Sequence, residues 1–368
     1  MNCSNAFDTV FPQRHRVASA GSAASPAALT ALSLMWVLVT MQQAGAVDQL
    51  VRRSDNATFR GEFQAMTNES VTIASANGKA ETISVADISS IRFDGAPSLW
   101  GQASANEQAG AYDQALTKYQ QMLADSGVTD KRIKAELEFL IARTQVRMAQ
   151  ADPQKVTTAT DAINKFRDAN KSNFRYLEAT ILQASISPAD VAGKLLQEVQ
   201  ASTVKGFQLE AGVRNGRLLL STGKADDAMA AFDTVIQSSQ GDAGAVSALL
   251  DAKVGRAECL LAQKDADAAV TALDEVLESA GESQTTILAT AWNLKGDSLR
   301  LQGKSKDALM AYLHVDLLYA GEPAQHAKSL FYLSQLWAPA GHQNRADDAA
   351  SRLKNSYGNS SWAGQLGQ

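Results

Sequence analysis

The spacing of apolar and polar residues changes once along the chain. Between residues 47 and 97, large apolar residues alternate with polar ones, as in Thr58–Phe63 and Val71–Ile73. A period of two is typical of strands with one buried face, and the Asn77-Gly78 dipeptide favours a hairpin turn. We therefore predict a module of four or five short strands, a small barrel or strongly curled sheet, that ends where Asp94–Pro97 breaks the pattern.

From Leu99 onward, apolar residues recur three and four positions apart, which is typical of amphipathic helices. The clearest stretch, residues 289–319, indicates two helices joined at Gly303. Its small and aromatic positions are Trp292, Gly296, Ala308 and Tyr312. Small residues let two helices approach to roughly 8–10 Å, and aromatic side chains can fill the space around such a crossing. The stretch therefore predicts a tightly packed helical hairpin.

This order of small and aromatic residues resembles the tetratricopeptide repeat family. Comparable positions recur at Gly110, Ala115 and Tyr119, at Gly216, Ala228 and Phe232, and at Ala269 and Ala349. The resemblance implies a mainly α fold, an α-solenoid of about seven helix pairs over residues 98–357. The β-barrel-like module before it is predicted from the alternating pattern, and its strand order resembles Sm-like small barrels. Residues Ala228, Ala269, Ala308 and Ala349 are 41, 39 and 41 positions apart, so each unit is longer than the family period, and Lys264 occupies the place of one turn glycine.

The first 46 residues have the order of a signal peptide. A basic patch, Arg14–Arg16, precedes an apolar run, Ala27–Val39, and then Ala44-Gly45-Ala46. We predict cleavage after Ala46 and export to the periplasm or the medium; the alternative is an uncleaved N-terminal membrane anchor. Cleavage would remove two arginines and one aspartate and lower the net charge from −5 to −6. At the other end, residues 358–368 are polar and rich in glycine, which predicts a mobile tail.

Charge and motifs exclude several functions. The strand-rich segment carries five basic and seven acidic residues, so it would repel a nucleic-acid backbone. His314, His326 and His342 lack the spacing of metal ligands, and no glycine-rich loop or nucleophile motif is present. Cys259 is the one cysteine after residue 46, and its helical setting predicts a core thiol. We therefore expect neither catalysis, a cofactor nor a metal; the remote alternative is an enzyme with a site between barrel and array.

The resemblance also implies a concave surface lined by the first helix of each pair. The expected lining residues are Glu210, Val213 and Arg217, then Asp251, Val254 and Glu258, then Asn293, Asp297 and Arg300. Family members that clamp a peptide carboxylate use Lys and Asn, whereas this chain has Arg217, Glu258 and Asp297 at such positions. A mixed, net acidic lining would suit an extended peptide with basic residues.

The function predicted from the sequence is therefore an exported protein–protein interaction scaffold that binds a protein or peptide partner on its concave face. The alternative is a self-associating structural or assembly protein of the cell envelope. Partner identity and oligomeric state stay open at this stage.

Overall fold

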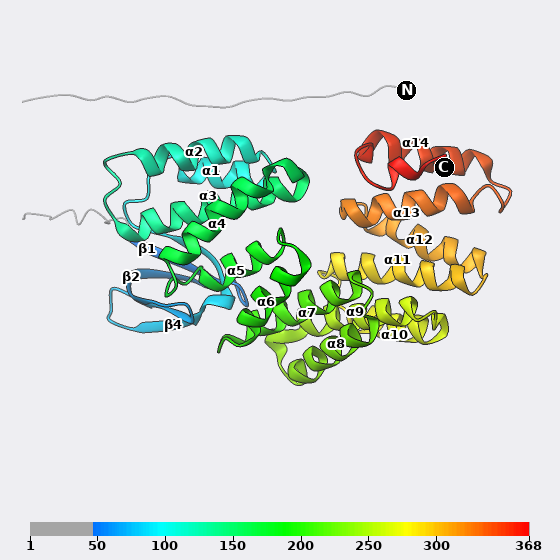
Figure 1. Cartoon of the computed structure of the whole chain (residues 1–368), viewed down its shortest axis with the longest axis horizontal. Coiled ribbons are helices and arrows are strands. Elements are labelled where there is room, and N and C mark those ends of the chain that lie inside the picture. The colour runs from blue at the N-terminus through cyan, green and yellow to red at the C-terminus, as the bar shows by residue number, and fades with distance from the viewer. Residues whose placement is uncertain (1–46, 368) are drawn as a thin grey trace, which may run out of the picture. The chain divides into compact units, whose positions relative to one another are not determined.

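In the computed structural model, which describes residues 47–367, a five-stranded antiparallel sheet precedes fourteen α-helices (Figure 1). The predicted signal peptide lies outside the described residues. None of the helices in the described part is both long and apolar enough to cross a membrane. The mainly α solenoid predicted from the sequence is confirmed.

The predicted strands form an open, bent sheet. They are β1 (Asp48–Arg52), β2 (Thr58–Met66), β3 (Ser70–Ala74), β4 (Ala80–Ser84) and β5 (Ile88–Arg92). Their order in the sheet is β4-β3-β2-β1-β5, and the register of β2 against β3 shifts between Phe63 and Ala65. Such irregularities bend a strand and increase its twist. No ladder joins β4 to β5 within the described residues, so of the two predicted forms, a small barrel or a curled sheet, the structure shows the curled sheet.

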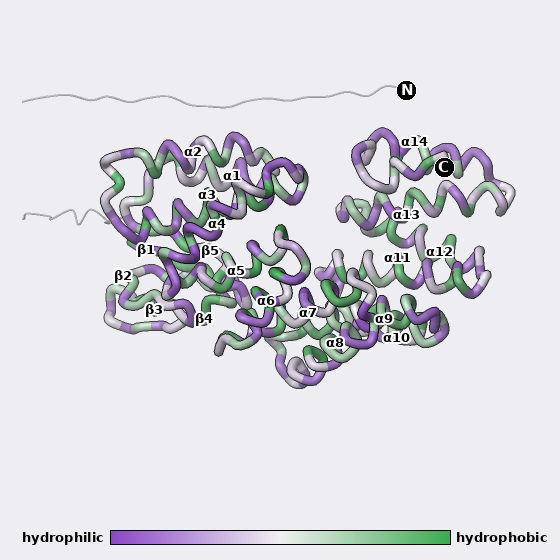
Figure 2. Tube along the Cα trace, viewed as in Figure 1, coloured by the Kyte–Doolittle hydropathy of each residue, from purple (hydrophilic) through white to green (hydrophobic). Residues whose placement is uncertain are grey.

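The helices form seven antiparallel pairs, each contacting the next along the chain. The pairs are α1 (Trp100–Gln108) with α2 (Tyr112–Ala124), α3 (Lys131–Ala151) with α4 (Val156–Ala169), α5 (Tyr176–Ala184) with α6 (Ala189–Gln200), α7 (Lys205–Ser221) with α8 (Ala225–Ser239), α9 (Val246–Ala262) with α10 (Ala266–Ser279), α11 (Thr285–Leu301) with α12 (Ser305–Leu318), and α13 (Pro323–Leu336) with α14 (Gln343–Tyr357). Hydrophilic and hydrophobic residues are interspersed along the helices (Figure 2), as expected for helices that bury one side and expose the other.

Small residues are required where the helices of a pair cross. A Cβ atom on Gly216 would lie 2.6 Å from the ring of Phe232, and one on Gly296 would lie 2.6 Å from the ring of Tyr312. Both rings are fully buried, and so are the other small and aromatic residues Ala115, Tyr119, Ala228, Ala269 and Ala308, while Ala349 is 3% exposed. Trp292 is only half-buried and stacks on His314 with ring centroids 4.0 Å apart.

The turns inside the pairs need a left-handed backbone. Gly303, between α11 and α12, has φ +74°, and Gly110 in the first pair has φ +75°. In the fifth pair the same turn is made by Lys264, whose φ is +65°. Side chains rarely adopt this conformation, so Lys264 is strained. The next residue, Asp265, caps α10 by accepting a hydrogen bond from the Ala268 amide.

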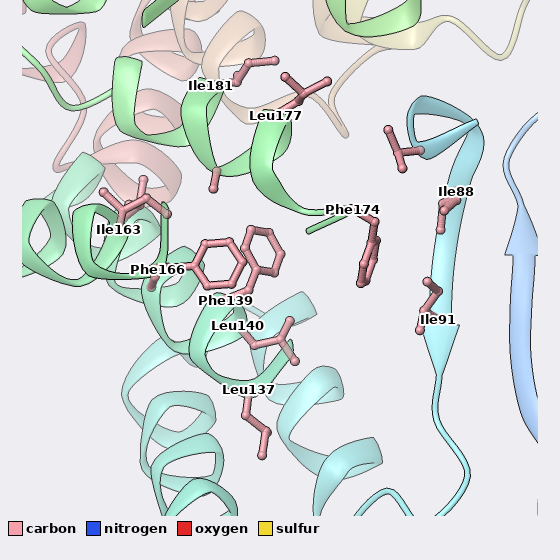
Figure 3. Close-up of a cluster of buried hydrophobic side chains, with 14 of the residues drawn as sticks. Ile88, Ile91, Leu137, Phe139, Leu140, Ile163, Phe166, Phe174, Leu177 and Ile181 are labelled. Atoms are coloured by element: carbon pink, nitrogen blue, oxygen red, sulfur yellow. The ribbon is translucent and has the colours of Figure 1, made fainter. Parts of the chain in front are cut away.

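One apolar core connects the sheet to the first helix pairs. Phe174 lies between Ile88 and Ile91 of β5 and the helices that carry Phe139 and Phe166 (Figure 3). The Phe139 and Phe166 rings lie 5.4 Å apart. Because these side chains interleave, apolar packing holds the sheet against the helical array, in addition to the covalent connection between them.

A buried carboxylate adds polar bonds to this contact. Asp48 is 4% exposed and accepts hydrogen bonds from the backbone amides of Phe63 (3.2 Å) and Asp94 (2.7 Å). Its other contact is an ion pair with Arg132 of α3, at 2.9 Å. Asp48 therefore joins β1, β2, the end of β5 and the second helix pair.

The last residues pack on the final pair. Trp362 lies 5.3 Å from the ring of Phe331 and 5.6 Å from that of Tyr332, both on α13. A short 3₁₀ turn, η4 (Ala363–Gln365), follows. Trp362 therefore packs on α13, and the mobility predicted for residues 358–368 stays a prediction.

Candidate functional site

The first helices of the last five pairs form one continuous surface. Helix α7 contacts α5 and α9, and α11 contacts α9 and α13. Each of these helices presents one face to the core and the other away from it, as solenoid repeats do. The exposed side chains of consecutive repeats are thereby brought next to one another.

Three adjoining clefts follow this surface. The sheet-side cleft is about 930 Å³, the middle cleft about 540 Å³ and the C-terminal cleft about 530 Å³. Arg217 and Asp251 line both the sheet-side and the middle cleft, and Glu258 lines both the middle and the C-terminal cleft. Because neighbouring clefts share lining residues, we treat the three as one groove that runs from the sheet to α13.

The sheet forms part of the sheet-side cleft. Arg53, Val85 and Ile88 line it together with residues of α5, α6 and α7. The Arg53 guanidinium donates a hydrogen bond to the Ile88 carbonyl (3.0 Å). On the helical side, a Cβ atom at Gly206 of α7 would lie 2.6 Å from the Cβ of Ala86. This close contact places the sheet at one end of the groove.

Two ion pairs lie along the groove, one between α7 and α9 and one within α7. Arg217 of α7 donates to Asp251 of α9 at 2.8 Å, and Arg214 donates to Glu210 one turn away, also at 2.8 Å. All four side chains are exposed, so each pair contributes little to folding stability. They do fix where positive and negative charge lie along the groove.

The C-terminal cleft has a polar and aromatic wall. Asp297 accepts a hydrogen bond from the Tyr312 hydroxyl (2.6 Å) and forms an ion pair with Lys328 (2.5 Å). Arg300 lies over the ring of Tyr332, 4.1 Å from its centroid. Burial, and then the charge of Asp297, raise the pKa of the Tyr312 hydroxyl. This tyrosine is therefore a neutral hydrogen-bond donor that orients Asp297.

Glu258, at the centre of the groove, lacks such partners. Its side chain is half-buried and makes no hydrogen bond or ion pair with any described residue. Burial raises the pKa of the Glu258 carboxyl, and the charges of Arg217 and Lys328 oppose that rise. Both cations are bound to other acids, Arg217 to Asp251 and Lys328 to Asp297.

The structure places most of the predicted lining residues in the groove. Its lining includes Glu210, Val213, Arg217, Asp251, Val254, Glu258, Asp297 and Arg300. Asn293 differs: it is 0% exposed, and its Nδ2 atom donates to the backbone carbonyl and the side chain of Gln325 on α13. We therefore correct Asn293 from a lining residue to a contact between neighbouring first helices.

Sequence reasoning missed the contribution of the last pair. Tyr332 and Leu336 of α13 complete the C-terminal cleft. The seventh pair matches the repeat pattern loosely, with three extra residues between Gly341 and Ala349, and no lining positions were predicted for it. Arg214 was also missed, although its position four residues after Glu210 on one helix face is a readable signal.

The titratable residues considered for chemistry lie apart. His314 stacks on Trp292 outside the groove, and the Nε2 atom of His326 lies 2.8 Å from Asp316. Cys259 is fully buried, and burial raises the pKa of its thiol to about 11. Among residues 47–367, no group of three or more His, Cys, Asp or Glu side chains could hold a metal ion.

Comparisons with known proteins agree with this fold. Residues 251–283 match the family model described as tetratricopeptide repeat. A tetratricopeptide repeat protein from Parabacteroides merdae is similar in structure, with a TM-score of 0.52 and 13% identity over 73% of this chain and 95% of that chain. A Rap protein complexed with competence and sporulation factor gives a TM-score of 0.50 and 14% identity over 72% and 76%. No curated protein matches the sequence.

The nested helix pairs, the family match over residues 251–283 and the structural likeness together support a tetratricopeptide repeat fold for the helical array. At this level of identity, the two structures are alike in fold alone.

Proposed function

We propose that this protein is an interaction scaffold that binds an extended segment of a partner protein in the groove and has no catalysis of its own. The observation that carries the proposal is the continuity of the three clefts across α7, α9, α11 and α13. Solenoids use such surfaces for recognition, because a partner can contact several repeats in succession. The Rap structure, which has a similar fold, contains a bound factor, in keeping with this use of the array.

Selection from a displayed library of random linear peptides tests this proposal. Peptides that bind the purified protein should bind the Ala262→Trp variant at least about tenfold more weakly, because Ala262 is exposed in the C-terminal cleft and a large side chain would fill it. The matched control is Ala230→Trp, an exposed alanine on α8 outside the groove. Equal binding to both variants, or no selected peptide, would contradict the proposal.

Export belongs to the proposal as well. The basic, apolar and Ala44-Gly45-Ala46 segments support cleavage after Ala46. Strand β1 begins at Asp48, so cleavage after Ala46 would leave every strand of the described sheet intact. N-terminal sequencing of the protein recovered from its own cells should start at Val47. A chain that retains its first residues in the membrane would favour the anchored alternative.

Self-association is a second candidate, favoured by an apolar face on α12. Met310 and Leu317 are 52% and 69% exposed and, seven residues apart, share one face of the helix; the neighbouring Leu318 is 65% exposed. Light scattering coupled to size exclusion separates the two functions. A strict monomer at high concentration excludes self-association, whereas a dimer that Leu317→Lys dissociates supports it.

A further inference from the structure

Glu258 lies where the middle cleft meets the C-terminal cleft. Its neighbours in the chain, Ala257 and Cys259, are both 0% exposed and belong to the core. The Glu258 side chain lines the two clefts instead. A ligand that follows the groove from α7 to α13 therefore has to pass this carboxyl group.

The other acidic residues of the lining have cationic partners within 4.0 Å. These pairs are Glu178 with Arg175, Glu210 with Arg214, Asp251 with Arg217, and Asp297 with Lys328. For Glu258, no partner exists among the described residues. The negative charge of the groove is thus unbalanced at one position rather than spread along it.

An unpaired, half-buried carboxylate is costly to the folded protein, because it loses water and gains no hydrogen bond in return. Arg217 and Lys328 reduce this cost only at longer range. A cation delivered by a ligand would supply the missing partner. The gain appears only in the complex, so it would add to affinity.

The surroundings of Glu258 suit a long basic side chain. Leu261, Leu294 and Leu336 line the C-terminal cleft beside it, while the ring of Tyr332 in the same lining is covered by Arg300. Lysine and arginine place methylene groups along apolar surfaces and keep the charge at the end. A small or acidic ligand residue would leave these leucines uncovered or add a second negative charge.

We propose that Glu258 is the anchor for a lysine or arginine side chain of the bound partner segment, and that it sets the charge preference of the groove. This inference rests on the proposed function, since it assumes that an extended segment occupies the groove. The preference for a positively charged ligand residue is thereby assigned to Glu258 alone, because the other acidic residues of the lining are already paired with cations of the protein.

Three pools of synthetic linear peptides test the assignment. Each pool has random flanks around one fixed central residue, which is lysine, glutamine or glutamate. The wild-type protein should retain the lysine pool about tenfold better than the glutamine pool. Glu258→Gln should abolish this preference, and Glu258→Lys should shift it to the glutamate pool. The control Glu278→Gln, at an exposed position on α10 whose side chain has no ion pair among residues 47–367, should keep the wild-type preference.

The outcomes separate the inference from the function on which it rests. If all pools bind equally and Ala262→Trp abolishes binding, the groove binds peptides but the inference is wrong. If a lysine preference survives Glu258→Gln, the inference is also wrong, because another site reads the charge. If no pool binds the wild-type protein, both the inference and the proposed function are overturned. A loss of preference together with unchanged or raised thermal stability of Glu258→Gln excludes unfolding as the cause and supports the inference.

Discussion

Gly296 lies so close to Tyr312 that a Cβ atom on the glycine would come within 2.6 Å of the tyrosine ring. The ring is fully buried and its hydroxyl is bonded to Asp297, so it cannot move aside easily. Gly296→Ala should lower the free energy of unfolding by about 1–2 kcal/mol, since overpacking outweighs the better helix propensity of alanine.

A glycine with room around it provides the control. A Cβ atom on Gly193, within α6, would meet only Leu218 at an ordinary 3.9 Å. Gly193→Ala should therefore raise the free energy of unfolding by up to about 1 kcal/mol. Urea unfolding measures both variants. Stabilisation by Gly296→Ala would show that the helices of the sixth pair do not cross as closely as described.

At the turns of the fifth and sixth pairs, exchanging glycine and lysine should change the free energy of unfolding in opposite directions: lysine in place of Gly303 destabilises, and glycine in place of Lys264 stabilises. Gly303→Lys should cost about 1 kcal/mol, because φ at this position is +74°. Lys264→Gly should give a smaller gain, because relief of the strained backbone is partly offset by the added freedom of the unfolded chain. Thermal unfolding compares the two. A destabilising Lys264→Gly would mean that the lysine side chain contributes more than its backbone strain costs.

Asp48 should be important for holding the sheet against the helices. Asp48→Ala removes the carboxylate that Arg132 and two backbone amides share and should cost about 3 kcal/mol. Asp94→Ala, at an exposed aspartate nearby, should change the free energy of unfolding by no more than about 0.5 kcal/mol. Equal effects of the two substitutions in urea unfolding would rule out the buried contact.

The difference in melting temperature between Glu258→Gln and the wild-type protein should depend on pH. The pKa of Glu258 is raised in the folded state, mainly by burial and also by Asp251, against the opposing charges of Arg217 and Lys328. The folded state therefore favours the protonated form of Glu258. The stability that the wild-type protein gains from this protonation is present at low pH and is lost as the pH rises through the raised pKa. Between about pH 4 and about pH 8, the melting temperature of Glu258→Gln should rise relative to wild type. The exposed control Glu278→Gln should show no such trend.

Cys259 should be inert in the folded protein. Its thiol is fully buried, with a pKa raised to about 11, and the reactive species is the thiolate. In a Cys3→Ser background, a thiol reagent should label Cys259 only after the protein is unfolded. The control is an additional Ala262→Cys substitution, whose exposed thiol at the end of α9 should react at once in the folded protein. Rapid labelling of native Cys259 would indicate that the fifth pair opens readily.

Sequence alone predicted the features that short-range patterns encode. The strands follow from alternation within a few residues, and the helix pairs follow from small and aromatic residues such as Gly296 and Tyr312, which lie within one hairpin. The pattern identifies which residues contact one another within a helix pair, because the hairpin fixes the spacing of those residues along the chain.

Features that depend on distant residues could not be predicted. Whether a lining acid is paired depends on the next repeat, as with Arg217 and Asp251, which lie 34 positions apart. The burial of Asn293 depends on Gln325 of the following pair. The polar composition of the last residues concealed the packing of Trp362 on α13.

Photo-cross-linking locates the bound segment most directly. A photoreactive amino acid is placed at Ser247 or Leu301, which line the groove, or at Ala230 on α8, and each protein is irradiated with a labelled peptide obtained from the library. We expect cross-links at Ser247 and Leu301 and none at Ala230. Cross-linking at Ala230 with none at the two groove positions would contradict the central claim that the partner segment lies along the first helices.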